Sequence, residues 1–408
     1  MVKTGANSFR VPKDQCLTLD LLRRRGSKRE SDDMPECADR YSCFWARNAI
    51  YHSLQALGVS PGDRVLVPAY ICQAAVEPIA AYGAIPDFYA VQRNCEPVFP
   101  ELVSKIALGT RALLAVHYFG FPQQIGRLRE LCDRYGLALI EDCAHVLRGT
   151  VDGHRLGTIG DAGIFSWRKF LPVYDGGELL LNMPRKKLRI LWSRESALTS
   201  LKVAVYLLDQ MPSESVGAIV QSTLGWAHRL REQLRRRSDS VAEKPASPAL
   251  NVNSLSFDRS LINFPMTRVS KWVMAHLDIS SIVERRRSNY ALLGQRLSAM
   301  DGVTVLFPEM PVDVCPWVMP MFIDGIPDAH LALRRLGIPA VTWGGVRPPA
   351  VTAEEFPDAD FLYQNLVFLP IHQSLRSQDL ELIVQTVREI VRKRGTLVFS
   401  GNSSSTSQ

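Results

Sequence analysis

Apolar and polar residues repeat with two different periods in the first half of the chain. Helical spacing, with apolar side chains three or four positions apart, occurs in three segments: 46–59, 74–83 and 126–136. Short apolar runs between these helices predict buried strands at 64–70, 84–91, 111–120 and 137–145. Strands that alternate with helices indicate an α/β fold with a mainly parallel sheet flanked by helices. Functional residues are then expected just beyond the carboxyl ends of the strands.

The pattern changes in the second half of the chain. Residues 183–256 contain two segments with helical spacing, 185–211 and 215–237, which we interpret as a helical insertion. A long helical stretch follows at 269–300 and leads into a smaller α+β lobe. The elements expected there are strands at 303–307 and 317–325 and helices at 329–337 and 379–395.

These patterns divide the chain into four parts. Residues 1–40 are polar and predict an extended or partly helical N-terminal arm that can pack on a partner subunit. Residues 41–257 form the large domain, which contains the insertion, and residues 258–396 form a smaller C-terminal domain. The Ser-rich residues 397–408 are expected to be a disordered tail.

Composition is that of an ordinary globular protein inside the cell. Hydrophobic residues make up 46% and charged residues 22% of the 408 residues, as in ordinary globular proteins. The eight cysteines are scattered without a C-x-x-C pair, which predicts reduced thiols in a cytoplasmic protein and no zinc site or other metal site. The chain has no apolar run of 18 residues and no apolar segment at its start, so we expect neither membrane spanning nor secretion.

The net charge of +7 suits anionic small molecules such as phosphates or nucleotides. It can also reflect the Arg-rich runs at 23–25, 229–237 and 285–287, whose default interpretation is solvated helix faces. The run at 229–237 could instead meet an anionic substrate, an acidic carrier or nucleic acid. No aromatic residues interleave with it, so a nucleic-acid partner is not expected.

The stretch 139–181 holds the strongest chemical signal. Asp142 follows an apolar run, Ser166 precedes Lys169 by three positions, and a Gly-Gly turn follows at Gly176. A buried carboxylate and a lysine on neighbouring strand ends are what pyridoxal phosphate (PLP) requires. The lysine forms a Schiff base with the aldehyde, and the carboxylate keeps the pyridine nitrogen protonated. A lysine in an exposed loop is the alternative interpretation of Lys169.

The neighbours of Asp142 define its environment. Glu141 is a competing acid, but alternation along a strand places the two side chains on opposite faces, so only one should face the site. Ala144 is small enough for a flat ring to lie against it. His145 could donate to the ring oxygen or be a structural histidine.

Two further segments offer binding groups. Ala46 and Arg47 begin the first strong helix, and a helix N-terminus can hold a phosphate, although an ordinary helix start is commoner. His117 and Tyr118 end a strand and could line the substrate pocket or form a core turn.

From about Tyr41 to Arg392 the chain resembles the DegT/DnrJ/StrS family of PLP-dependent aminotransferases, which have fold type I. The motifs that carry the resemblance occur in the family order: GVSPGDRVLVPAY, AVHYFGFP, LIEDCAH, GTIGDAGIFSWRKFLPVYDGG, LINFPMTRVSKWV and FLPIHQSLRSQDL. The serine and lysine are three positions apart here and five apart in many members of the family.

The resemblance implies a role for each matching residue. Lys169 would bind PLP as a Schiff base, Asp142 would face the pyridine nitrogen, and His145 would lie near the ring oxygen. Ser166 and the Ala46–Arg47 backbone would bind the phosphate. Asn263 matches an asparagine that reaches the phosphate from the second subunit, which implies a homodimer with a shared site. Cys72 occupies the position where many members stack an aromatic residue on the ring, and Tyr70 could substitute for it.

The resulting prediction is an aminotransferase that moves an amino group from glutamate or glutamine to a keto sugar or another natural-product keto intermediate. Lys169 would act as general base and acid. One alternative is a PLP enzyme of the same fold that performs elimination, dehydration or condensation. Another is a catalytically silent PLP-fold protein that acts as a partner subunit.

Overall fold

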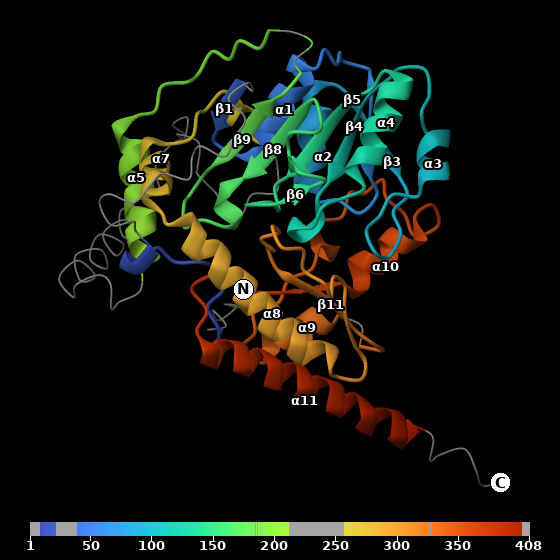
Figure 1. Cartoon of the computed structure of the whole chain (residues 1–408), viewed down its shortest axis with the longest axis vertical. Helices are drawn as coiled ribbons and strands as arrows, with labels where there is room; N and C mark the ends of the chain where they lie inside the picture. The colour runs from blue at the N-terminus through green and yellow to red at the C-terminus, as the bar shows by residue number, and fades with distance from the viewer. Residues whose placement is uncertain are drawn as a thin grey trace, which may run out of the picture.

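The computed structural model describes residues 9–21, 39–183, 185, 187–211, 257–326 and 328–401. Figure 1 shows a large lobe built on a wide sheet and a smaller lobe beside it, at the carboxyl-terminal end of the chain.

The large lobe is built on a seven-stranded sheet. Its strand order is β1-β9-β8-β5-β4-β2-β3, and β9 runs in the direction opposite to the other six strands. The strands are β1 (Asp39–Cys43), β2 (Arg64–Pro68), β3 (Ile85–Tyr89), β4 (Thr110–Val116), β5 (Ala138–Cys143), β8 (Ala162–Ser166) and β9 (Gly177–Leu181). The middle strands are buried along their whole length, as expected for a sheet covered on both faces. This confirms the predicted α/β class with a mainly parallel sheet.

Helices pack on this sheet, with α1 against β8 and β9 and α4 against β4 and β5. The helices of the large lobe are α1 (Ala46–Ala56), α2 (Gln73–Tyr82), α3 (Phe99–Ser104), α4 (Ile125–Tyr135), α5 (Ala197–Asp209) and α7 (Arg268–His276). A short hairpin, β6 (Thr150–Val151) and β7 (His154–Arg155), lies beside the sheet. Helical 3-10 turns occur at η1 (Leu19–Leu21), η3 (Tyr118–Gly120), η4 (Trp167–Lys169) and η5 (Arg259–Leu261).

The smaller lobe is an α+β unit, as the sequence predicts. Its antiparallel sheet has the order β10-β11-β12, with β10 (Val303–Val305), β11 (Met319–Ile323) and β12 (Val367–Leu369). Its helical elements are α8 (Ile279–Ser298), α9 (Ala329–Arg335), η6 (Gly344–Val346), α10 (Pro357–Asn365) and α11 (Ser377–Gly401). In Figure 1, α8 runs from the large lobe into the small one, and α11 lies along the outer edge of the small lobe.

Three expected helices have different bounds in the structure. The segment 185–211 is helical only in α5, which begins where the Ser196 hydroxyl accepts a hydrogen bond from Thr199 N. The stretch 269–300 is two helices, because the Asp278 carboxylate caps a new helix by accepting from Ser281 N. The closing helix continues to Gly401, so part of the expected tail 397–408 is helical. The expected helix at 215–237 and residues 402–408 lie outside the described residues.

The arm is described over residues 9–21, where it packs on its own chain. Backbone N–H groups of Arg10 and Val11 donate to Gly337 O, and Cys16 N donates to Ser374 Oγ. Val11 and Leu21 are buried. Gln15 Nε2 donates to Arg168 O of the large lobe at 2.8 Å, so this part of the arm contacts both lobes.

Within the residues that the structure describes, no helix combines the length and the apolar character needed to cross a bilayer.

Candidate active site

Three neighbouring elements bring the predicted residues to one cavity. Asp142 lies at the end of β5 and Ser166 at the end of the adjacent strand β8, and η4 then carries Lys169. The cavity has a volume of about 160 Å³. Eight of the predicted site residues line it, namely Ala46, Arg47, Cys72, Asp142, Ala144, His145, Ser166 and Lys169.

Alternation along β5 separates its two acids, as predicted. Asp142 faces the cavity, and its Oδ1 accepts a hydrogen bond of 2.9 Å from Ala144 N. Burial raises the pKa of the Asp142 carboxyl, while the nearby Lys169 opposes that rise. Glu141 lies on the other face, where it belongs to a separate hydrogen-bond network.

Lys169 sits in a desolvated setting. Burial lowers its pKa to about 8, against the opposing influence of Asp142. Its Nζ lies 4.8 Å from the centre of the Trp317 ring. A substantial fraction of this amine is therefore neutral near pH 7–8, as a nucleophile requires.

His145 is held between two aromatic rings. Its ring stacks on Trp317 at 4.2 Å and lies parallel to Phe119 at 5.8 Å between centroids. Phe119 N donates to its Nδ1 at 3.3 Å, and burial keeps its pKa well below the usual value. The neutral ring thus carries its proton on Nε2, which makes Nε2 a donor.

The N-terminus of α1 forms another part of the wall. Trp45 precedes the helix without a side-chain cap, and Ala46 and Arg47 line the cavity. Strand β9 approaches this terminus so closely that a Cβ on Gly177 would lie 2.4 Å from Ala46 N. The Gly-Gly motif therefore allows the helix start to lie against the sheet.

Two guanidinium groups lie close together at this end. Burial lowers the pKa of Arg47, and nearby Arg168 lowers it further. Like charges at short range repel each other, so an anion between them would be favourable.

The cavity wall also contains residues outside the predicted set, among them Trp45, Arg168 and Trp343. Arg168 lies within the motif between Ser166 and Lys169, where a cation next to the lysine is visible in the sequence. Trp343 comes from the small lobe, where nothing in the local sequence connects it with Lys169. Cys72 does line the cavity, whereas Tyr70 is fully buried and packs on Trp343.

The structure does not bring His117 and Tyr118 to this cavity. His117 Nδ1 accepts from Gln123 N, and its Nε2 lies 3.0 Å from Glu141 Oε2. The Tyr118 hydroxyl donates to Tyr70 O. Both side chains are buried, so they occupy the core turn that was the alternative to a substrate pocket.

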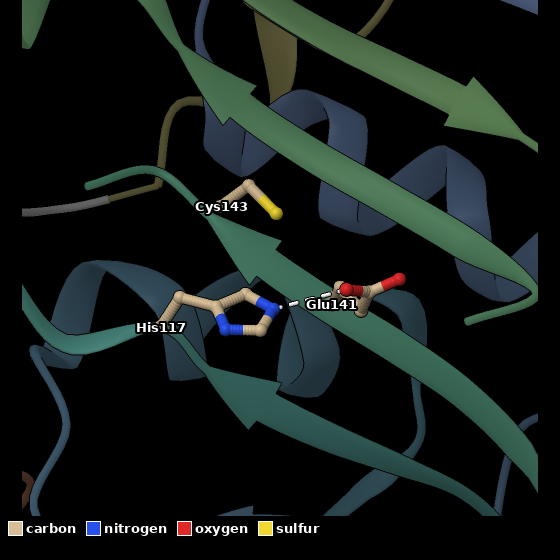
Figure 2. Close-up of side chains that lie close together, drawn as sticks. All are labelled: His117, Glu141 and Cys143. Carbon is tan, nitrogen blue, oxygen red and sulfur yellow. Dashed lines mark hydrogen bonds and ion pairs between the residues drawn. The ribbon is translucent and has the colours of Figure 1, made fainter. Parts of the chain in front are cut away.

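Figure 2 shows His117, Glu141 and Cys143 close together, with ligand atoms within 4.8 Å of one another. The Glu141 oxygens already accept four hydrogen bonds, three of them from backbone N–H groups of the turn 157–160. The lone pairs that a metal would need are thus engaged, and this cluster joins β4, β5 and the turn.

Asn263 lies outside the cavity within its own chain. It is partly buried, and its backbone carbonyl accepts from Ser193 N at 2.9 Å. Its predicted contact with the cofactor of a second subunit stays a prediction.

The fold matches solved structures over most of their length. An aminotransferase TlmJ from Streptoalloteichus hindustanus is 23% identical, with a TM-score of 0.59 over 88% of this chain and 86% of that chain. The putative sugar aminotransferase Spr1654 from Streptococcus pneumoniae is 17% identical, with a TM-score of 0.61 over 88% of this chain and 87% of the other. The architecture is therefore that of the fold-type-I aminotransferases.

Sequence similarity is concentrated in the large lobe. Residues 45–207 match the model of the DegT/DnrJ/EryC1/StrS aminotransferase family. GDP-perosamine synthase from Vibrio cholerae is 39% identical over 137 residues, 33% of this chain and 37% of the relative. L-glutamine:2-deoxy-scyllo-inosose aminotransferase from Streptomyces kanamyceticus is 33% identical over 135 residues, 32% of each chain. The chain thus aligns with about a third of the length of these curated relatives, and the predicted family resemblance is confirmed.

Proposed function

We propose that this protein is a PLP-dependent aminotransferase. It would move an amino group from an amino-acid donor, glutamate or glutamine, to a keto sugar or a related natural-product ketone. The observation that carries this proposal is that Lys169, Asp142, Ser166 and the N-terminus of α1 line one cavity.

The donor set of the cavity fits PLP. Lys169 offers a partly neutral amine for the aldehyde, and Asp142 offers a buried carboxylate for the pyridine nitrogen. Ser166, Arg47 and the free N–H groups at the start of α1 suit a phosphate. Ala144 and Cys72 leave room for a flat ring, and the His145 Nε2–H would donate to the ring oxygen.

Bound PLP supplies an electron-accepting ring that stabilises negative charge at the donor Cα. Lys169 would take the proton from that Cα and return it at C4′ of the cofactor, since its pKa of about 8 suits both roles. Asp142 would hold the proton on the ring nitrogen through its negative charge. The aromatic walls, Trp45, Trp317 and Trp343, would limit the access of water.

The substrate class rests on the relatives. By their names, one of those relatives makes GDP-perosamine and the other aminates 2-deoxy-scyllo-inosose with L-glutamine as donor. Both names concern amination of a sugar or sugar-like ring, and the proposal adopts a keto sugar or related ketone as acceptor for this chain.

The direct test is borohydride reduction followed by peptide mass spectrometry. A pyridoxyl group on Lys169 is expected, and amination of the cofactor on addition of glutamate or glutamine should be visible in the absorption spectrum. Failure to find a pyridoxyl adduct in protein supplied with PLP would refute the proposal. An adduct without amination by either donor would point to elimination or condensation chemistry instead.

We also infer a cytoplasmic homodimer with a shared site. The described cysteines form no disulfide among themselves, which is typical of a reducing compartment. The dimer rests on the resemblance of Asn263 to the asparagine that reaches across the subunit boundary. Sedimentation of the protein, with Asn263→Ala compared for PLP affinity, tests it: a monomer with full affinity would exclude a shared site.

A further inference from the structure

The N-terminal arm lies beside the loop that carries Lys169. The side-chain amide of Gln15 donates from Nε2 to two backbone carbonyls of that loop, Arg168 O at 2.8 Å and Leu171 O at 3.2 Å. These carbonyls lie on either side of Lys169 in the sequence. The two hydrogens of one amide nitrogen thus hold the backbone before and after the reactive residue.

The lysine loop depends on donors from outside itself. Lys169 ends the 3-10 turn η4, and the last carbonyls of a helical turn have no N–H partner within that turn. Gln373 Nε2 donates to Phe170 O at 2.9 Å, and Arg286 Nη2 lies 3.4 Å from the same oxygen. Gln15 adds donors for the flanking carbonyls, so three side chains from other parts of the chain hold this short loop.

The arm is anchored to the small lobe on both sides of Gln15. On one side, His372 Nε2 lies 3.1 Å from Pro12 O. On the other side, Cys16 N donates to Ser374 Oγ at 2.9 Å. The small lobe therefore fixes the backbone of Gln15, while the amide of Gln15 holds the lysine loop of the large lobe.

The arm also forms one wall of a second cavity, which has a volume of about 320 Å³. Gln15 and its two preceding residues line this cavity, and Lys169 lines both the first and the second cavity. Farther along the arm, Leu17 and Leu21 are buried in the same apolar cluster as Phe170. The arm thus helps to exclude water from the surroundings of the Lys169 amine, and this burial lowers its pKa to about 8.

We propose that the arm is a strap that positions Lys169: Gln15 holds the lysine loop, and the contacts of the arm with the small lobe hold Gln15. Gln15 is then a positioning residue that acts through the backbone of the loop, although it lies 153 positions before Arg168 in the sequence. This inference rests on the proposed function, because it concerns the amine that would attach PLP.

Gln15→Met tests the strap, because methionine has a similar length and donates no hydrogen bond. Without the two bonds the loop can move and admit water to the amine, so more of the amine is protonated near pH 7. Competitive acetylation of the cofactor-free protein, read by peptide mass spectrometry, should show Lys169 about tenfold less reactive at pH 7. This is the size expected from the loss of one to two neutral hydrogen bonds. Attachment of PLP, followed by stopped-flow absorbance, should slow by a similar factor.

Gln385→Met on α11 is the matched control. It removes a hydrogen bond from Gln385 Nε2 to Glu381 at the protein surface, and both measurements on Lys169 should equal those of the wild type. If Gln15 had a merely structural role, Gln15→Met would ease urea unfolding and leave the pH dependence of Lys169 acetylation unchanged. That result would overturn the proposal.

Ser374→Ala tests the anchor of the strap. It removes the acceptor for Cys16 N and should lower the reactivity of Lys169 about threefold. Because this effect reaches Lys169 through Gln15, the double variant should be no less reactive than Gln15→Met alone. Effects that multiply, or no effect of Ser374→Ala, would show that the small lobe does not hold Gln15 and would overturn the strap.

Acetylation and PLP attachment separate this inference from the proposed function. A wild type that is acetylated at Lys169 but takes up no PLP would refute the aminotransferase, and the acetylation of Gln15→Met would still decide the strap. Equal reactivity of Lys169 in the wild type and in Gln15→Met would overturn the strap and leave the attachment of PLP intact.

Discussion

At the scale of single residues, the setting of Lys169 determines what its amine can do. Replacement by alanine should abolish covalent attachment of the cofactor, since no other described lysine lines the first cavity. The measurement is the loss of the pyridoxyl adduct after borohydride reduction, together with the loss of visible absorbance. Lys271→Ala, on exposed α7, should keep both signals. An undiminished adduct in Lys169→Ala would show that another amine holds the cofactor.

The lowered pKa of Lys169 predicts a pH dependence for cofactor attachment. The neutral amine is the attacking form, and its fraction rises about tenfold per pH unit below the pKa. With a pKa of about 8, attachment to cofactor-free protein should accelerate as the pH rises to about 8 and should level off above it. Stopped-flow absorbance across this range measures the rate. A rate that kept rising toward pH 10 would contradict the desolvated setting, because an exposed lysine titrates near 10.5.

Asp142 and Glu141 are adjacent acids with different expected effects. Asp142→Asn should retain bound cofactor and lower turnover roughly 100-fold or more, the size found when one preorganised electrostatic group is removed. Glu141→Gln should leave the site chemistry intact and lower the free energy of unfolding by about 2–3 kcal/mol, because it breaks buried hydrogen bonds to the turn 157–160. Turnover and urea unfolding measured on both variants separate these roles. If Glu141→Gln lost turnover and Asp142→Asn lost only stability, Glu141 would be the functional acid.

The residues of the cofactor cavity were predictable because they follow apolar runs in a fixed order. Asp142 and Ser166 lie on the ends of adjacent parallel strands, and η4 carries Lys169 directly after Ser166. His117 has the same sequence signature, yet both of its ring nitrogens are used inside the core. Position at a strand end therefore does not reveal which face a side chain takes. Trp343 could not be found, since its contact depends on how the two lobes pack.

At the scale of elements, the approach of α1 to β9 creates the helix start that faces the cavity. Gly177→Ala would place a Cβ 2.1 Å from Trp45 C, so either the strand or the helix must shift. We expect a loss of about 1–3 kcal/mol in the free energy of unfolding, typical of overpacking, and weaker PLP binding. Gly126→Ala in α4 is the control, because no heavy atom lies within 4 Å of its added Cβ. Urea unfolding and PLP titration of the two variants measure both effects. Equal stability and equal PLP affinity in the two variants would show that the close approach of α1 to β9 does not require a glycine at position 177.

The bounds of two helical segments differ from the sequence prediction because side-chain caps interrupt the apolar spacing. Apolar spacing continues through 269–300, but Asp278 offers a cap that ends one helix and begins the next. In 185–211 the spacing also continues, while Ser196 starts the helix 11 residues after the expected beginning. Periodicity reports which side chains prefer burial, whereas side-chain caps determine where the backbone changes direction.

At the scale of the whole molecule, the lobes are joined through the loop that carries Lys169. Arg286 on α8 donates from Nε to Gln373 Oε1 at 2.9 Å and from Nη1 to Trp317 O at 3.0 Å. Its Nη2 lies 3.4 Å from Phe170 O, directly after Lys169. Gln373 completes the link by donating to Phe170 O from its own amide at 2.9 Å. One buried guanidinium thus connects the small lobe with the lysine loop.

Arg286→Leu should therefore affect both stability and chemistry. It leaves Trp317 O and Gln373 Oε1 without the donor that Arg286 supplies, and each such group costs about 1–3 kcal/mol, so we expect unfolding to be easier by about 3 kcal/mol or more. Attachment of PLP to Lys169 should also slow, because the loop loses its fixed position. Arg296→Leu on the same helix breaks only a surface pair with Glu381 and should cost no more than about 1 kcal/mol, with unchanged attachment. Urea unfolding and stopped-flow attachment, measured on both variants, test the link. If Arg286→Leu matched Arg296→Leu in both measurements, the lobes would be held by their apolar contacts and the lysine loop would be positioned by the large lobe alone.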